Sequence, residues 1–194
     1  MIDQIKNQIL EGNKLNLKIL ESCMSEIELS INIINNSITQ HHKILWCGNR
    51  GSASISQYLA YELMSEGMSF HERKPIPSIA LTTDGSLLTI SSDDNGSNSI
   101  FSRQIQGLGY KNDILVGFSH TGNSKNILSA FKQAKFKGLK TIAITGDYNN
   151  QLSQIVDVLI RIPSTHPQRI QAGFLIIGQA ICRQVEDTFL LLHE

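Results

Sequence analysis

The chain has 194 residues with equal numbers of basic and acidic side chains, 17 of each, so its formal net charge at pH 7 is zero. This length suits one α/β domain with a sizeable core, and the charge balance argues against broad binding to nucleic acid or to a membrane surface. The three cysteines, Cys23, Cys47 and Cys182, lie far apart, which is typical of reduced thiols in a cytosolic protein. The polar start at residues 1–6 has no signal-peptide core, and no apolar run approaches the ~20 residues that span a bilayer. We therefore expect a cytoplasmic protein with one domain, residues 1–194, and no membrane segment.

Residues 1–40 are predicted to be helical, in two pieces, and to form an N-terminal arm. Isoleucines recur at helical spacing over residues 2–9 and again over residues 27–38, so each piece has an apolar stripe. Gly12 and Ser22, each with the residue that follows it, are the candidate kinks. Helices of this kind pack on a core or on a partner subunit, and we expect the stripes to be buried between subunits.

The rest of the chain alternates between short apolar runs, typical of buried strands, and helical patterns. Strands and helices that alternate at these intervals predict a mainly parallel sheet covered by helices on both faces. In such folds ligands bind beyond the carboxyl ends of the strands. The predicted strands are 43–47, 78–81, 113–118, 140–145 and 156–162, and the predicted helices are 52–65, 98–108, 123–137 and 167–191.

The turn at residues 119–124, between a predicted strand and a predicted helix, has the features of an anion site. The first backbone N–H groups of a helix lack internal partners, and the helix dipole makes that end positive. The hydroxyls of Ser119, Thr121 and Ser124 add neutral donors, and Gly122 lets the backbone approach an oxyanion closely. The expected guest is a phosphate monoester. The alternative is an ordinary strand-to-helix turn in which serine and threonine only cap the helix.

A second turn of this type, residues 48–52, follows the first predicted strand and leads into the helix over 52–65. Its glycines and its serine repeat the anion-site pattern. Residues 93–96 form a polar loop before the helix predicted over 98–108. Both glycine–hydroxyl turns lie at strand carboxyl ends, where ligands bind in folds of this class.

The chain contains six short motifs, in this order: residues 47–52, 93–94, 100–103, 119–124, 145–146 and 169–171. Together they make it resemble the sugar isomerase (SIS) domain. Within that family it looks most similar to the bacterial phosphoheptose isomerases of the lipopolysaccharide heptose pathway, which interconvert sedoheptulose 7-phosphate and a heptose 7-phosphate. The resemblance covers nearly the whole chain. It implies a three-layer α/β sandwich with a five-stranded parallel sheet, assembled as a homotetramer with active sites between subunits.

The same resemblance implies which residues bind a phosphorylated sugar. The turn at 119–124 would hold the phosphate. The turn at 48–52, the loop at 93–94 and the last helix would contact the sugar chain. The residues expected to bind substrate are Asn49, Arg50, Gly51, Ser52, Asp93, Asp94, Ser119, His120, Thr121, Ser124 and Gln171.

The chain departs from the family at the positions of its zinc ligands. The isomerases carry a zinc-binding His and, one helical turn later, a Glu; the matching residues here are Tyr58 and Glu62. In the last helix the family has a Gln and, eight residues on, a His; the matching residues here are Gln171 and Gln179. The spacings keep each pair on one helix face, but one carboxylate and one amide are a poor ligand set for zinc. We therefore expect no zinc and no other cofactor.

Glu62 and His120 are the residues expected to carry out chemistry, by analogy with the family site. Glu62 is placed to act as a general base next to a substrate carbonyl, and His120 can supply a cation or acid–base help. For each of them the alternative is a solvated side chain without a catalytic role. Gln179 cannot act as an acid in place of histidine, because a neutral amide does not titrate near neutral pH. Tyr58 is expected to fill the space that the histidine and the metal leave.

Several other residues are expected to have structural roles. Cys47 ends a buried strand and is interpreted as inert packing. Arg103 and Arg169 are interpreted as pairing between helices, with contact to substrate as the alternative. His166 is interpreted as a turn residue, with a position facing the substrate cavity as the alternative. Arg50 stands where the family usually has glycine, so a positive φ at this position would strain it.

The departures leave a non-catalytic regulator as the alternative function. The DnaA initiator-associating proteins share this scaffold, have lost catalytic residues at this site and bind the replication initiator as tetramers. This chain differs from them because it keeps Glu62. A SIS-type transcription regulator, and with it direct contact with nucleic acid, is disfavoured because no basic helix-turn-helix segment precedes the domain. The sequence favours a phosphosugar-binding protein of the phosphoheptose isomerase type and leaves its activity open.

Overall fold

The computed structural model describes residues 1–65, 73–90 and 96–191. Five parallel strands form one sheet in the order β2-β1-β3-β4-β5. β1 and β3 lie at its centre and are buried along their whole length, as expected for a parallel sheet with both faces covered. The strands are β1 (Ile44–Gly48), β2 (Ser78–Ala80), β3 (Ile114–Ser119), β4 (Lys140–Gly146) and β5 (Val158–Ile162).

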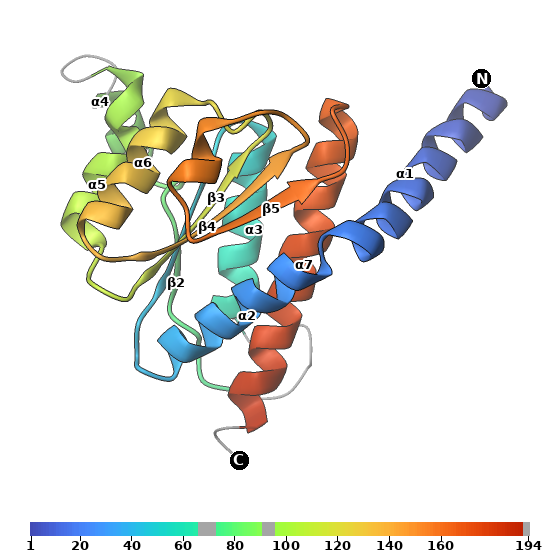
Figure 1. The fold of residues 1–194 in the computed structure, drawn as a ribbon. Coiled ribbons are helices and arrows are strands. Elements are labelled where there is room, and N and C mark those ends of the chain that lie inside the picture. The colour runs from blue at the N-terminus through green and yellow to red at the C-terminus, as the bar shows by residue number, and fades with distance from the viewer. Residues whose placement is uncertain (66–72, 91–95, 192–194) are drawn as a thin grey trace.

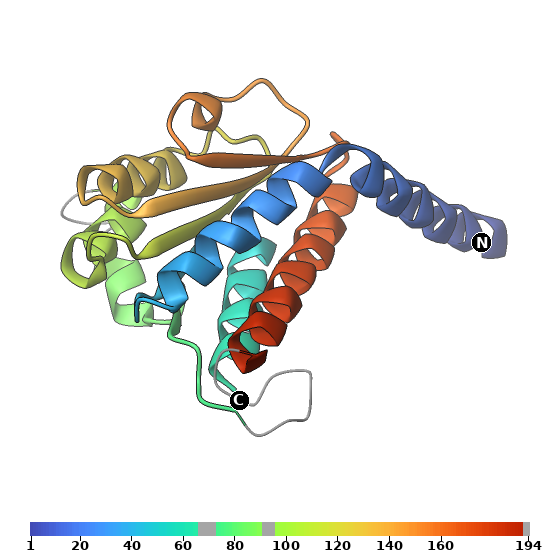
Figure 2. The same ribbon diagram turned by 60° about the horizontal axis from the view of Figure 1, so that its bottom comes forward.

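Helices cover both faces of the sheet (Figures 1 and 2). One face packs against α2 (Met24–Ile38), α3 (Gly51–Met64) and α7 (Pro167–Leu191). The other face packs against α5 (Ile100–Leu108) and α6 (Lys125–Phe136). The three-layer α/β sandwich with a five-stranded parallel sheet is confirmed.

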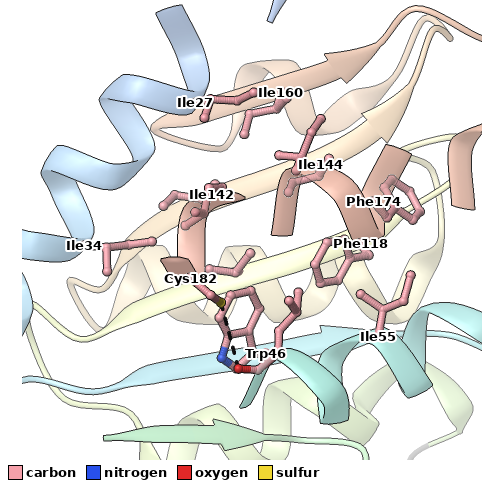
Figure 3. Packing of buried hydrophobic residues seen from close by; sticks show 14 of the residues in the cluster. Ile27, Ile34, Trp46, Ile55, Phe118, Ile142, Ile144, Ile160, Phe174 and Cys182 are labelled. Atoms are coloured by element: carbon pink, nitrogen blue, oxygen red, sulfur yellow. Dashed lines mark hydrogen bonds between the residues drawn. The ribbon is translucent and has the colours of Figure 1, made fainter. Parts of the chain in front are cut away.

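Two apolar cores form because successive side chains of a strand point to opposite faces. In β1, Trp46 belongs to the core under α3 and α7, while Leu45 belongs to the core under α5 and α6. Trp46 is fully buried, donates from Nε1 to Ser78 Oγ at 2.8 Å and stacks on Phe118 with ring centroids 6.2 Å apart. Figure 3 shows these rings beside Phe174 of α7. The sheet and its main helical layer are therefore held together by aromatic as well as aliphatic packing.

The N-terminal arm is helical in two pieces, as predicted. α1 (Ile2–Ser22) runs unbroken through Gly12 and ends at Cys23, whose φ of −122° separates it from α2. Cys23 Sγ donates to the carbonyl oxygen of Arg161 at 3.4 Å, which ties the break to β5. α1 extends away from the rest of the molecule (Figures 1 and 2). Its large apolar residues that remain exposed are Ile2, Ile5, Ile9, Leu10, Leu17 and Leu20.

Several local features differ from the sequence prediction. A short helix α4 (Gly85–Ile90), not predicted, follows Asp84, whose Oδ1 accepts from the Leu87 N–H at 3.1 Å. A 3₁₀ turn at residues 97–99 leads into α5. β5 begins two residues later than predicted because Asp157 bonds the side chain and backbone of Thr141 instead of continuing the strand.

None of the helices in the described ranges combines the length and the apolar character needed to cross a bilayer.

The three cysteines are buried free thiols. Burial raises the pKa of the Cys47 thiol far above its usual range, in agreement with a packing role.

Candidate functional site

The two glycine–hydroxyl turns lie side by side at the carboxyl edge of the sheet. β1 ends at Gly48, which is in register with Phe118 of the neighbouring strand β3. β2 lies on one side of this pair and β4 on the other, so the strand order reverses between β1 and β3. Ligands in open parallel sheets bind at such a reversal. The fold thus brings both predicted turns to the place where a ligand site is expected.

The turn at 119–124 is built around Gly122. Gly122 has φ of 68°, and a Cβ there would lie 2.5 Å from the Asn150 side chain, so the turn requires glycine. Its N–H donates to Ser119 Oγ at 3.2 Å, and Ser119 Oγ donates to Ser124 Oγ at 3.3 Å. Ser124 is the N-cap of α6, yet its side chain makes no capping hydrogen bond within the described structure. The Ser124 hydroxyl therefore bonds to Ser119 and does not cap the helix, and both hydroxyls lie at the positive end of α6.

We expect Ser119→Ala combined with Ser124→Ala to weaken binding of a sugar phosphate by about 1–3 kcal/mol, the range for hydrogen bonds lost to a charged group. Changing both residues removes the hydroxyl pair together and leaves neither one with a missing partner. Isothermal calorimetry with sedoheptulose 7-phosphate measures the change. Ser129→Ala, on the same helix but outside the cavity lining, is the matched control. Equal affinity of the double variant and the control would contradict a phosphate site here.

The turn after β1 is joined to the turn after β3 by a pair of amides. Asn49 Nδ2 donates to Asn126 Oδ1 at 3.0 Å, and Asn126 Nδ2 donates to Asn49 Oδ1 at 2.8 Å. Arg50, the N-cap of α3, has φ of 55° and ψ of −124°. The strain expected for a non-glycine residue is therefore present, and strained residues of this kind persist mainly at functional sites.

His120 is held against the wall of the site by Gln171 and Phe174. Its Nε2 lies 3.0 Å from Gln171 Oε1, an oxygen that also accepts from Ser52 Oγ at 3.4 Å. An amide oxygen only accepts, so this contact is a hydrogen bond in the tautomer that carries its hydrogen on Nε2. The ring stacks on Phe174 with centroids 5.5 Å apart. Gly51 permits this arrangement, since a Cβ there would lie 3.0 Å from Gln171 Nε2.

A cavity of about 810 Å³ opens between the two turns. Arg50 at the start of α3 and Lys125 at the start of α6 line it, and no carboxylate does among the described residues. Two cations and a helix N-terminus favour an anion in this cavity. Of the residues expected to bind substrate, those that line it are Asn49, Arg50, Ser52, Ser119, His120, Thr121 and Ser124.

Six further residues line the cavity and were not predicted from the sequence: Ser97, Asn98, Phe118, Lys125, Asn126 and Pro167. Lys125 and Asn126 come directly after Ser124, in the first turn of α6. Because the start of a helix favours an anion, this position could have identified both as binding residues from the sequence. Ser97 and Asn98 reach the cavity only through the 3₁₀ turn before α5, which no local pattern marks.

Glu62 lies apart from this cavity. It is buried on α3, 9% exposed, and does not line the cavity. Its charge acts on Tyr58 of the same helix and on Cys182 of α7, and its carbonyl oxygen accepts from Arg73 Nη2 at 2.9 Å. Glu62 and the turn at residues 119–124 are therefore separate within one chain.

The two glutamines of α7 also have different surroundings. Gln171 contacts His120 and Ser52, whereas Gln179 Nε2 donates to the Tyr58 hydroxyl at 3.1 Å. Eight residues of helix separate them along the axis by about 12 Å. Tyr58 thus makes a specific hydrogen bond in addition to filling space.

Zinc does not fit the residues around Tyr58, Glu62 and Gln179. Tyr58 and Gln179 stand at the family's histidine positions, and they bond to each other. The Glu62 carboxylate is the one strong zinc ligand in that set, whereas zinc takes three or four nitrogen, sulfur or carboxylate ligands. In the ranges 1–65, 73–90 and 96–191, no three histidine, cysteine or acidic residues are grouped as a metal site would need.

The other residues singled out in the sequence lie outside the cavity or outside the described residues. Asp93 and Asp94 lie outside the described residues. Arg169 donates from Nη1 to the Gln8 carbonyl oxygen and from Nη2 to Gln8 Oε1, each at 3.0 Å, and so pairs α7 with α1 as predicted. His166 is exposed just before α7, in the turn that the sequence predicts, and Arg103 on α5 does not line the cavity.

Known proteins resemble this chain over nearly its full length. The model of the SIS domain matches residues 10–146. Phosphoheptose isomerase from Burkholderia pseudomallei (strain 1710b) is 38% identical over 186 residues, which cover 95% of this chain and 93% of that protein. The structure of a phosphoheptose isomerase from Francisella tularensis has a TM-score of 0.91 and 28% identity, over 96% of this chain and 98% of that one. A phosphoheptose isomerase structure from Neisseria gonorrhoeae has a TM-score of 0.88 and 28% identity, over 95% and 98%. With its parallel sheet, its two turns at the strand reversal and a family model that spans well over half its length, this chain belongs to the SIS domain family.

Proposed function

We propose that the protein is an aldose–ketose isomerase for a phosphorylated sugar, of the phosphoheptose isomerase type. The observation that carries the proposal is the hydroxyl turn at the start of α6, which opens into a cavity lined by two cations. A phosphate monoester suits this site because it meets hydroxyls, positive charge and a helix N-terminus together. The relatives are named phosphoheptose isomerase. Sedoheptulose 7-phosphate as the ketose and a heptose 7-phosphate as the aldose are what the family resemblance of the sequence implies.

Within this proposal one group of residues holds the phosphate and a second group contacts the sugar. Ser119, Thr121 and Ser124 hold the phosphate, with Lys125 and Arg50 as counter-charges. The residues proposed to contact the sugar are Asn49, Gly51, Ser52, Asp93, Asp94, His120 and Gln171.

The reaction needs one base and one acid. The base, proposed to be Glu62, removes a proton from C1 of the ketose, and the electron pair forms a C1–C2 double bond while an acid protonates the C2 oxygen. Loss of the O1 proton and return of a proton to C2 then gives the aldehyde at C1. His120 or a water molecule is the proposed acid, because the imidazolium form of His120 carries a proton on Nδ1 that it can donate.

A second copy of the chain is proposed to complete the site. Glu62 and the hydroxyl turn are separate within one chain, so a base from another subunit would bring both to one substrate. The exposed apolar side chains of α1, which extends from the molecule in Figure 1, favour burial against such a copy. We propose a homotetramer, as the resemblance implies, with the arm at residues 1–40 in its interfaces and the chain forming a single domain.

Ile5→Glu combined with Ile9→Glu is expected to dissociate the assembly, because each change places a charge in a buried apolar contact. Light scattering of the full chain at micromolar concentration should report a tetramer for the natural sequence and a smaller species for the variant. Asn7→Glu with Asn13→Glu adds the same charge to polar positions of α1 and should leave the tetramer intact. A natural chain that is a stable monomer would refute the assembly.

One assay tests the function directly. Purified protein is incubated with sedoheptulose 7-phosphate, with and without added zinc, and proton NMR follows the anomeric signals of the aldose product. Turnover that disappears in the Ser119→Ala, Ser124→Ala variant supports the proposal. Binding of the sugar phosphate without turnover would instead support a non-catalytic regulator, which a binding assay with the replication initiator would then test. That alternative is not favoured, because relatives that match nearly the whole chain bear the name phosphoheptose isomerase.

A further inference from the structure

Helices α3 and α7 pack directly on each other beside the residues that replace the family's histidines. Gly178 of α7 packs on Leu59 of α3, and a Cβ on Gly178 would clash with Leu59 Cδ1. Cys182 Sγ, one helical turn further along α7, donates to the Leu59 carbonyl oxygen at 3.9 Å. Tyr58 precedes Leu59 and Gln179 follows Gly178, so the close crossing sets these two side chains opposite each other.

The two opposed side chains bond directly. Gln179 Nε2 donates to the Tyr58 hydroxyl oxygen at 3.1 Å, and the charge of Glu62, one helical turn further along α3, acts on the same hydroxyl. Because the phenol oxygen accepts from the amide, its own hydrogen is free to point at the carboxylate. Gln179, Tyr58 and Glu62 therefore form one polar cluster between α7 and α3.

We propose that the Tyr58–Gln179 hydrogen bond occupies the place of the family's zinc ion, joining α3 to α7 and holding the Glu62 carboxylate without a metal. The inference that this pair positions a catalytic base depends on the proposed isomerase function. The inference that it replaces the metal as a link between two helices does not depend on that function.

The neighbouring charges are consistent with a site that holds no cation. Arg73 already supplies a positive charge, since its Nε lies 2.8 Å from Glu186 Oε1 and its Nη2 donates to the Glu62 carbonyl oxygen. Burial, and then the charges of Glu62 and Glu186, raise the pKa of the Cys182 thiol far above its usual range.

The first experiment measures metal and stability without any assay of activity. The natural chain is loaded with zinc chloride, freed of excess metal and analysed for bound zinc, and its melting temperature is recorded with zinc and with EDTA. We expect no stoichiometric zinc and the same melting temperature in both solutions. Tyr58→Phe should lower the melting temperature by about 2–4 °C through loss of the hydrogen bond. Tyr61→Phe, on the exposed side of the same helix, should not change it.

The second experiment restores the metal ligands. Tyr58→His with Gln179→His places two imidazoles beside the Glu62 carboxylate, three ligands that zinc accepts. This variant should bind about one zinc per chain, and zinc at a hundredfold excess over Kd should raise its melting temperature by about 5–11 °C, reversibly with EDTA. Either single change should bind far less zinc.

The outcomes separate this inference from the proposed function. One tightly held zinc in the natural chain, equal melting temperatures for the Tyr58→Phe and Tyr61→Phe variants, or no zinc in the double-histidine variant would each overturn the metal replacement. If the natural chain turns over substrate, Tyr58→Phe should lower kcat with little change in KM, and EDTA should not lower kcat. If it shows no turnover, the proposed function fails while the zinc and melting experiments still decide whether the pair replaces the metal.

Discussion

Glu62→Gln is expected to lower the turnover of sedoheptulose 7-phosphate by a factor of about 10²–10⁴, the usual contribution of a general base. Glutamine keeps the shape and the hydrogen-bonding oxygen of glutamate but cannot take a proton near neutral pH. Affinity for the sugar phosphate should stay nearly unchanged, because the substitution leaves in place the hydroxyls and the two cations that line the cavity. Proton NMR of the product gives the rate, and calorimetry gives the affinity.

Glu28→Gln is the matched control, because it makes the same chemical change at an exposed position of α2. It should retain full turnover. If the two variants are equally active, Glu62 is not the base. Loss of binding along with turnover in Glu62→Gln would point instead to a structural role for this buried carboxylate.

Arg73→Met is expected to lower the free energy of unfolding by about 3–5 kcal/mol, the cost of leaving one member of a buried ion pair without its partner. The Arg73 and Glu186 side chains are only 1% and 4% exposed, and Nε lies 2.8 Å from Oε1. The same guanidinium donates to the carbonyl oxygens of Glu62 and Leu63 at the end of α3. The substitution therefore removes both the charge of the pair and the cap of a helix C-terminus.

The chain contains a natural comparison for this substitution. Arg183 and Asp187 pair on the surface of α7, with side chains 47% and 37% exposed and Nε 3.0 Å from Oδ1. Arg183→Met should change the free energy of unfolding by less than about 1 kcal/mol, because water screens an exposed pair. Urea unfolding of both variants at one protein concentration measures the difference. Similar small effects for Arg73 and Arg183 would show that the buried pair is not a main source of stability.

The sequence alone determined those features that depend on local chemistry and periodicity. Alternating strand and helix patterns predicted the parallel sheet, because a buried strand needs an apolar run and a crossover helix needs a 3.6-residue stripe. The turn with Gly122 was predictable because only glycine readily adopts its positive φ, and the strain at Arg50 followed from the same rule. The replacement of two family histidines by Tyr58 and Gln179 was also visible in the sequence.

Only the tertiary structure decided which of these residues meet. Asn49 pairs with Asn126, and His120 pairs with Gln171. The members of each pair are far apart in the sequence, so no local sequence pattern predicts that they are in contact. The close crossing of α3 and α7 opposes Tyr58 to Gln179. Glu62 lies apart from the cavity in one chain because the direction of a side chain depends on how its helix packs, and residue spacing along one helix does not determine that packing.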